Sequence, residues 1–162
     1  MAWWGTDPHA ELPSDPDVAT SVSRPLHLRP SSWAWVFGGG VLGTALRYYG
    51  EVVLPHDGAG WPWATFSINL FGAFVLGALL EALARLGDDS GWRLRARLFA
   101  GTGGCGAFTT YSTFALETVS LTRGGHVGTA VAYGLVSVVG GVVTAWLGIV
   151  AASAVRRRRV VS

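Results

Sequence analysis

The stretch GGCGAFTTYSTF, residues 103–114, interrupts one of the long hydrophobic tracts of this 162-residue chain. Three of its first four residues are glycine, and polar or aromatic side chains follow from Thr109 onward. Glycine costs about 1 kcal/mol relative to alanine in a helix interior. An interrupted helix is tolerated in a membrane only where protein or a cavity satisfies the freed backbone groups. The stretch therefore predicts a transmembrane helix that is broken in mid-membrane.

The composition around this stretch is that of a membrane protein. Half of the residues are hydrophobic and only 14% are charged, whereas about 25% are charged in a typical soluble domain. Four tracts have the roughly 20 apolar residues that a helix needs to cross a bilayer: residues 32–54, 61–83, 97–121 and 127–155. We expect an all-α integral membrane protein with four transmembrane helices in one domain, residues 32–155. A disordered tail (1–31) would precede it and a basic tail (156–162) would follow.

Arginine is distributed very unevenly between the two expected sides of the membrane. All 12 basic residues are arginines; ten lie in the two tails and the middle loop, while only Arg123 falls on the opposite side and Arg47 lies within a span. Basic residues concentrate on the cytoplasmic side of membrane proteins. The pattern predicts a multi-pass protein of the cell membrane with cytoplasmic N- and C-termini. The arginine run at 156–159 is expected to bind anionic lipid headgroups rather than nucleic acid.

Polar side chains within the spans are costly in hydrocarbon, so each is a candidate for function. Arg47 either extends to the interface or draws an anion toward an aqueous mouth, and both interpretations stay open. Asn69 either bonds to a neighbouring helix, which is the default, or donates an N–H to a permeating anion. Tyr133 and Ser137 are four residues apart and share a helix face. They either bond to neighbouring helices or line a wet path.

Residues 103–114 themselves combine two kinds of candidate. Carbonyl groups freed at a helix break are suitable ligands for Na⁺, as in the discontinuous helices of transporters. Tyr111 and Phe114 are three residues apart on one face, and the positive edge of an aromatic ring can face an anion. Close glycine packing and an aromatic core explain each residue taken singly. The combination favours a functional break.

Together these segments resemble the Fluc (CrcB-type) fluoride-channel family. The matching pieces are GGVLGTALRY (39–48), NLFGAFVLG (69–77), GGCGAFTTYSTFALE (103–117) and the Tyr133 and Ser137 pair, within about residues 36–152. The resemblance implies an antiparallel dimer with two fluoride pores along its interface. It also implies a structural Na⁺ at the dimer centre, held by main-chain carbonyls of both subunits.

The resemblance also assigns roles to individual residues of this chain. Gly106 and Thr109 would offer their carbonyls to Na⁺, and Glu117 matches the acid that follows the family's motif. The fluoride pathway would be formed by Asn69, Tyr111, Ser112, Thr113, Phe114, Tyr133 and Ser137, with Arg47 at the vestibule. The chain departs from the family's usual pattern at three positions, where Tyr111 replaces phenylalanine, Ala107 replaces glycine and Gly141 replaces serine.

The predicted function is passive fluoride efflux, which lowers cytoplasmic fluoride without an enzymatic step. The four histidines lie scattered in tails and loops, without metal spacing or a nucleophile nearby. One alternative is a proton-coupled multidrug-type exporter, which needs an acid deep in the membrane, but Glu51, Glu81 and Glu117 lie toward span ends. Another is a non-conducting membrane assembly subunit. Because the arginine bias favours a single orientation, we hypothesise a separate, oppositely oriented homologous subunit as the dimer partner.

Overall fold

The computed structural model describes residues 25–55 and 60–160, and all regular structure in this part of the chain is helical. Most of the predicted N-terminal tail therefore lies outside the described residues. The elements in order are a 3₁₀ helix η1 (Leu26–Leu28), α1 (Pro30–Val53), α2 (Trp63–Leu86), α3 (Gly91–Ala96), a π-helix η2 (Arg97–Cys105), α4 (Gly106–Phe108), α5 (Tyr111–Arg123) and α6 (Val127–Val160).

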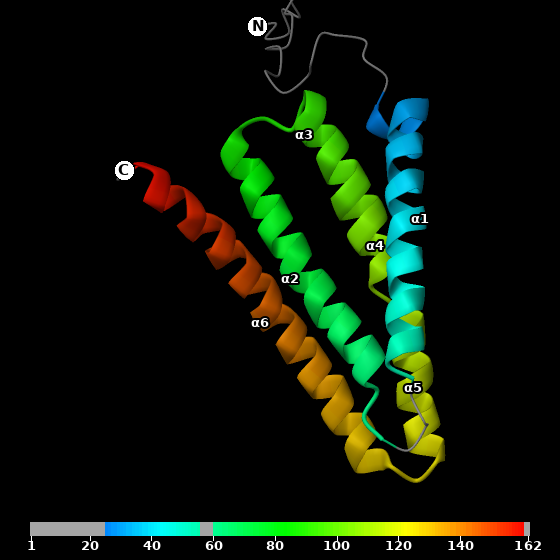
Figure 1. The fold of residues 1–162 in the computed structure, drawn as a ribbon. Coiled ribbons are helices and arrows are strands. Elements are labelled where there is room, and N and C mark those ends of the chain that lie inside the picture. The colour runs from blue at the N-terminus through cyan, green and yellow to red at the C-terminus, as the bar shows by residue number, and fades with distance from the viewer. Residues whose placement is uncertain (1–24, 56–59, 161–162) are drawn as a thin grey trace, which may run out of the picture.

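The helices pack in two pairs. Helix α2 lies along α6, and α1 lies along η2 and α4, which continue α3 (Figure 1). Helix α1 begins and α6 ends at the same end of the molecule, where α3 also lies, while α5 packs against α6 at the opposite end (Figure 1). The segment that contains residues 103–114 is therefore in contact with both α1 and α2.

Glycines bring the paired helices together backbone to backbone. A Cβ atom added to Gly39 would lie 1.8 Å from the carbonyl oxygen of Phe99, and one added to Gly103 would lie 2.3 Å from that of Val36. The α2–α6 pair has the same feature, since a Cβ on Gly77 would lie 2.3 Å from the carbonyl oxygen of Ala145. Small residues at such positions allow membrane helices to approach closely.

The break in the third tract does not lie at the glycines. Gly103 belongs to η2 and Gly106 to α4, so the expectation that glycines open the backbone is wrong. The helical path stops after Phe108, Thr109 and Thr110 are extended (ψ 157° and 122°), and α5 begins at Tyr111. Gly103 is required for the close contact with α1, whereas a Cβ atom added to Gly106 would meet no atom within 4 Å in the described structure.

The outer surface is apolar, as expected for a membrane protein. By length and mean hydropathy, two of the described helices qualify as membrane spans, Trp63–Leu86 with 1.8 and Val127–Ala154 with 2.2. Large hydrophobic side chains such as Phe37 and Val142 are mostly exposed, which suits a surface covered by lipid or by another subunit. The count of four spans and the antiparallel dimer stay predictions.

Helix α6 is longer than the expected span. It continues through Arg156–Arg159 to Val160, where the sequence predicted a separate basic tail. Arginine has a high helix propensity, which favours helical structure in the arginine run.

Candidate functional site

The break at Thr109 and Thr110 is held by a side chain of α2. The Asn69 Nδ2 donates to the Thr110 carbonyl oxygen at 3.0 Å, and the Thr110 N–H donates to the Asn69 Oδ1 at 2.8 Å. One amide thus satisfies both backbone groups of an extended residue that is 7% exposed. Asn69 therefore bonds between helices, as the default interpretation expected. One of its two amide hydrogens is used in this pair, and the other is left for a further acceptor.

Thr110 also starts the next helix. It is the N-cap of α5, and its Oγ1 accepts a hydrogen bond from the Thr113 N–H at 3.2 Å. Its hydroxyl lies 3.0 Å from the Thr113 Oγ1 and 3.2 Å from the Ser112 Oγ. Two predicted pathway residues, Ser112 and Thr113, are thus grouped around a third hydroxyl, that of Thr110, which sequence reasoning did not single out. An N-cap threonine at the start of a polar run was the signal that could have identified it.

The same bonds leave two carbonyl groups without their usual helical donors. In an unbroken helix the Gly106 carbonyl would accept from the Thr110 N–H, which donates instead to Asn69. The Thr109 carbonyl would accept from the Thr113 N–H, which donates instead to Thr110 Oγ1. These are the two positions expected to bind Na⁺. Carbonyl oxygens suit that ion, so the donor set fits, and the role itself stays a prediction.

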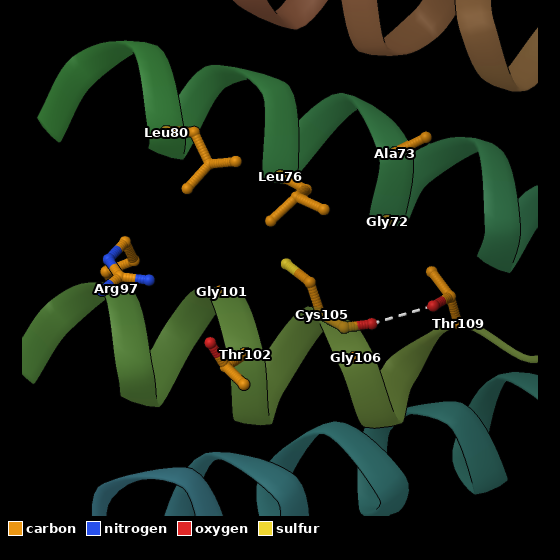
Figure 2. A pocket seen from close by; sticks show the side chains of 10 residues that line it. All are labelled: Gly72, Ala73, Leu76, Leu80, Arg97, Gly101, Thr102, Cys105, Gly106 and Thr109. Atoms are coloured by element: carbon orange, nitrogen blue, oxygen red, sulfur yellow. Dashed lines mark hydrogen bonds between the residues drawn. The ribbon is translucent and has the colours of Figure 1, made fainter. Parts of the chain in front are cut away.

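Gly106 and Thr109 border an open pocket of about 480 Å³ between α2 and the η2–α4 segment. Figure 2 shows it, with Leu76 and Leu80 of α2 on one wall and Cys105, Gly106 and Thr109 on the other. The Thr109 hydroxyl turns back to the Cys105 carbonyl oxygen at 3.0 Å (Figure 2). Because the pocket is open on the outside of the chain, both residues are accessible from outside the chain.

Arg47 reaches the break from the α1 side. Its Nε donates to the Ala107 carbonyl oxygen at 3.2 Å, and its Nη1 lies 3.5 Å from Glu51 Oε1. Ala107 is in the last turn of α4, so the guanidinium satisfies a carbonyl at the end of this short helix. Arg47 therefore supports the break directly. This contact was not among the two interpretations that the sequence left open.

Four of the predicted fluoride-pathway residues line a single pocket of about 320 Å³. The lining residues are Asn69, Thr109, Thr110, Tyr111, Phe114, Ser137 and Val138. The Ser137 Oγ is buried and has no hydrogen-bond partner among the described residues. A buried hydroxyl without a partner costs free energy. Its donor is therefore not used by another group of the described residues.

An aromatic series runs from this pocket into the interior. The rings of Tyr111 and Phe114 are 6.2 Å apart, and those of Phe114 and Tyr133 are 5.0 Å apart. Tyr111 is 81% exposed, whereas Tyr133 is fully buried. The extra hydroxyl of Tyr111 therefore lies on an open face, where it does not displace a packed neighbour.

The inner end of this series is tied to a carboxylate. The Tyr133 hydroxyl donates to Glu117 Oε2 and the Thr65 hydroxyl donates to Glu117 Oε1, both at 2.7 Å. Sequence reasoning noted Glu117 but missed Thr65. The available signal was spacing, because Thr65 precedes Asn69 by four residues and so lies on the same face of α2. The polar residues of α2 thus hold both the break and Glu117.

Comparison with known proteins identifies the family of this chain. The family described as "CrcB-like protein, Camphor Resistance (CrcB)" matches residues 34–149. The chain belongs to the CrcB family. Among its relatives, "Fluoride-specific ion channel FluC 2" of Leifsonia xyli subsp. xyli is 45% identical over 140 residues, which cover 86% of this chain and 96% of the relative. "Fluoride-specific ion channel FluC 1" of Cutibacterium acnes is 42% identical over 134 residues, which cover 83% and 94%.

The CrcB relatives confirm two predictions from the sequence. The resemblance to the fluoride-channel family is confirmed by the matched family and by the names of the curated relatives. The prediction that the chain is not an enzyme is also confirmed, because these CrcB relatives are named as ion channels.

Proposed function

We propose that this chain is a fluoride channel of the cell membrane that lowers cytoplasmic fluoride by passive efflux. The observation that carries the proposal is the pocket of about 320 Å³ in which Asn69, Ser137 and Phe114 meet, with the Ser137 hydroxyl buried and without a partner among the described residues. A small, strongly hydrated anion leaves water only where donors replace its hydration shell. This pocket offers such donors beside aromatic rings.

Different residues of the pocket would replace different parts of the hydration shell of the anion. The spare Asn69 N–H and the Ser137 O–H supply conventional hydrogen bonds, and the edge of the Phe114 ring carries partial positive charge. Tyr111 would extend the path toward the exposed face and Tyr133 toward the interior. The bonds of Ser112, Thr113 and Arg47 would stabilise the backbone at the break. Several weak sites in series suit conduction, because an ion must leave each site as readily as it enters.

The driving force needs no energy-coupled step. Hydrogen fluoride crosses membranes as a neutral acid and ionises in the cytoplasm, where the anion is trapped. A membrane potential that is negative inside favours exit of the anion by roughly 2.3 kcal/mol per 100 mV. A selective pore is therefore sufficient to lower cytoplasmic fluoride.

A structural Na⁺ is part of this proposal. The carbonyls of Gly106 and Thr109 would hold it together with their counterparts from a second subunit, and the ion would supply a fixed positive charge at the dimer centre. Support comes from the diversion of the Thr110 and Thr113 N–H groups to side-chain acceptors. Because the ion is structural, it is not transported.

The assembly that we propose is an antiparallel dimer of four-span subunits, with the third span broken in mid-membrane. The open pockets at Gly106 and at Tyr111 support it, since a partner would be needed to close them. The ten-to-one arginine distribution supports a single orientation with cytoplasmic termini. The partner would then be a homologous subunit inserted the other way.

The test is anion release from liposomes that contain the full-length chain. The vesicles are loaded with potassium fluoride or potassium chloride, valinomycin is added, and ion-selective electrodes follow the release. With a co-expressed homologue of opposite arginine bias, fluoride is expected to leave rapidly and chloride to stay, whereas rapid release by the chain alone would contradict the separate partner. Replacement of Na⁺ by N-methylglucamine on both sides should abolish release. Protein-free vesicles serve as the control.

The outcome also separates the alternatives. A multidrug-type exporter would move an organic cation against a proton gradient and release no fluoride, and an assembly subunit would do neither. If the chain alone is silent, the measurement is repeated with a co-expressed homologue of opposite arginine bias. The absence of fluoride release in both cases would contradict the proposal.

A further inference from the structure

A basic pocket lies where α2 ends and α3 begins, away from the Thr109–Thr110 break. It has a volume of about 250 Å³. Its lining residues are Leu80, Leu83, Ala84, Gly87, Asp89, Arg93 and Arg97. The leucines and the alanine come from the last turns of α2, and the arginines come from α3 and η2. One wall is thus apolar and the other is cationic.

The two arginines lie one helical turn apart and so share a face. The Arg97 Nη2 is bound to Asp89 Oδ2 at 2.5 Å, but the Arg97 Nε is buried and has no hydrogen-bond partner in the described part of the chain. The Arg93 Nε donates to the Asp88 backbone oxygen at 2.6 Å. The pocket is lined by two guanidinium groups and by one carboxylate, that of Asp89, so its net charge is positive.

The Arg93 guanidinium lies against a glycine. Gly87 follows α2 with a φ of +116°, and a Cβ atom placed there would lie 3.7 Å from Arg93 Cζ. Glycine adopts this conformation without strain. The Arg93 guanidinium therefore lies beside the backbone at the end of α2. Its Nε donates to the Asp88 carbonyl oxygen.

The position of the pocket suits a lipid headgroup. Helix α2 is a candidate membrane span that ends at Leu86, so Gly87 and the arginines lie at a bilayer surface while Leu80 and Leu83 lie one to two turns deeper. Trp92 beside them is 58% exposed, and tryptophan is enriched at membrane interfaces. The pocket is cationic at headgroup level and apolar below it.

We propose that this pocket binds the phosphate of an anionic phospholipid, with an acyl chain along Leu80 and Leu83. Arginine is well suited to phosphate because its planar donors can bind two oxygens at once. Basic pockets at the ends of membrane helices are a known way to hold such headgroups. Inorganic phosphate has the same anionic chemistry but would leave the leucine wall without an occupant. The basic pocket shares Leu80 and Arg97 with the pocket at Gly106 and Thr109, whereas Arg93 lines only the basic pocket.

The experiment measures thermal unfolding of the purified full-length chain in a neutral detergent. Dioctanoyl phosphatidylglycerol is titrated, and two parallel titrations use dioctanoyl phosphatidylcholine and inorganic phosphate. We expect a saturable rise in Tm with phosphatidylglycerol and little change with the other two. In Arg93→Gln the half-saturating lipid concentration should rise at least about tenfold, since hydrogen bonds to charged groups are strong.

Two further variants make the result specific. Arg95→Gln removes the same charge from an exposed residue of the same helix that does not line the pocket, and it should titrate like the wild type. Asp89→Asn removes the competing carboxylate and should tighten binding about fivefold. Because this last change predicts a gain, it remains informative even if Arg93→Gln folds poorly.

Three results would overturn the proposal. If inorganic phosphate produces the full shift, the ligand is a free anion and not a lipid. If phosphatidylcholine acts as well as phosphatidylglycerol, the arginines do not select the headgroup. If Arg93→Gln and Arg95→Gln lose affinity equally, binding reflects diffuse surface charge. Fluoride release from Arg93→Gln in neutral vesicles should equal that of the wild type, which separates this site from the channel.

Discussion

The glycines at 103–106 and the threonines at 109–110 are neighbours in the chain, but they serve different purposes. At Gly103 the chain stays helical, and the absence of a side chain allows the Val36 carbonyl oxygen to approach. At Thr110 the chain leaves the helix, and Asn69 takes over both backbone hydrogen bonds. Gly103 therefore marks close helix packing, whereas the helix break requires side chains that replace the lost bonds.

The largest loss of stability is expected when Gly103, at the close helix contact, is substituted. Gly103→Ala would place a methyl group 2.3 Å from the Val36 carbonyl oxygen, so two backbones would have to separate. We expect a loss of about 3 kcal/mol in the free energy of unfolding, the upper range for overpacked cores. Thermal unfolding in detergent measures it.

A matched control is Gly128→Ala in α6, where an added Cβ would meet no atom within 4 Å in the described structure. This change should leave stability unaltered or raise it by up to about 1 kcal/mol. Equal Tm values for the two variants would show that α1 and η2 do not pack through these glycines.

The next largest effect belongs to the break. Asn69→Leu removes both bonds to Thr110 and leaves a buried N–H and C=O without partners. We expect a loss of about 2 kcal/mol in stability and a loss of fluoride release from liposomes. Ser67→Ala, on the exposed face of the same helix, should behave like the wild type. A stable Asn69→Leu variant would mean that the break is held by other groups.

A smaller effect is expected at the cap of α5. Thr110→Val keeps the side-chain shape but removes the hydroxyl that accepts the Thr113 N–H. Loss of an N-cap costs about 1 kcal/mol, so the Tm should fall by less than in Asn69→Leu. Thr122→Val is the control, because the Thr122 hydroxyl donates to the Thr118 carbonyl oxygen of its own helix. Tm values for Thr110→Val and Thr122→Val that do not differ would argue against a capping role for Thr110.

Much of the fold was predictable from the sequence, because hydrophobic tracts of bilayer length identify membrane helices directly. The tracts 61–83 and 127–155 correspond closely to α2 and α6. The break lies within the stretch 103–114, but at the threonines and not at the glycines. Glycine is ambiguous because it is poor in helices, yet it is also what close helix contacts require. Only the distances to Val36 and Phe99 resolve this ambiguity, and they join residues far apart in the sequence.

The residues of the candidate site could largely be predicted from the sequence, but their hydrogen-bond partners could not. The family resemblance identified Asn69, Tyr111, Phe114 and Ser137, and the structure places all four around one pocket. It did not reveal that Asn69 pairs with Thr110 or that Thr65 binds Glu117. Each of these pairs spans more than forty residues of sequence, and no local pattern reports such a pairing.

The most direct test of the central claim, that fluoride passes through this pocket, is fluoride release by Ser137→Ala. The Ser137 hydroxyl has no hydrogen-bond partner among the described residues, so its loss should leave the Tm unchanged or raise it slightly. A hydrogen bond to a charged group contributes about 1.5 kcal/mol or more, and we therefore expect release to slow by about tenfold. Ser153→Ala is the matched control, because that hydroxyl binds Glu81 and Arg85 instead. Release at the wild-type rate by Ser137→Ala would contradict the account.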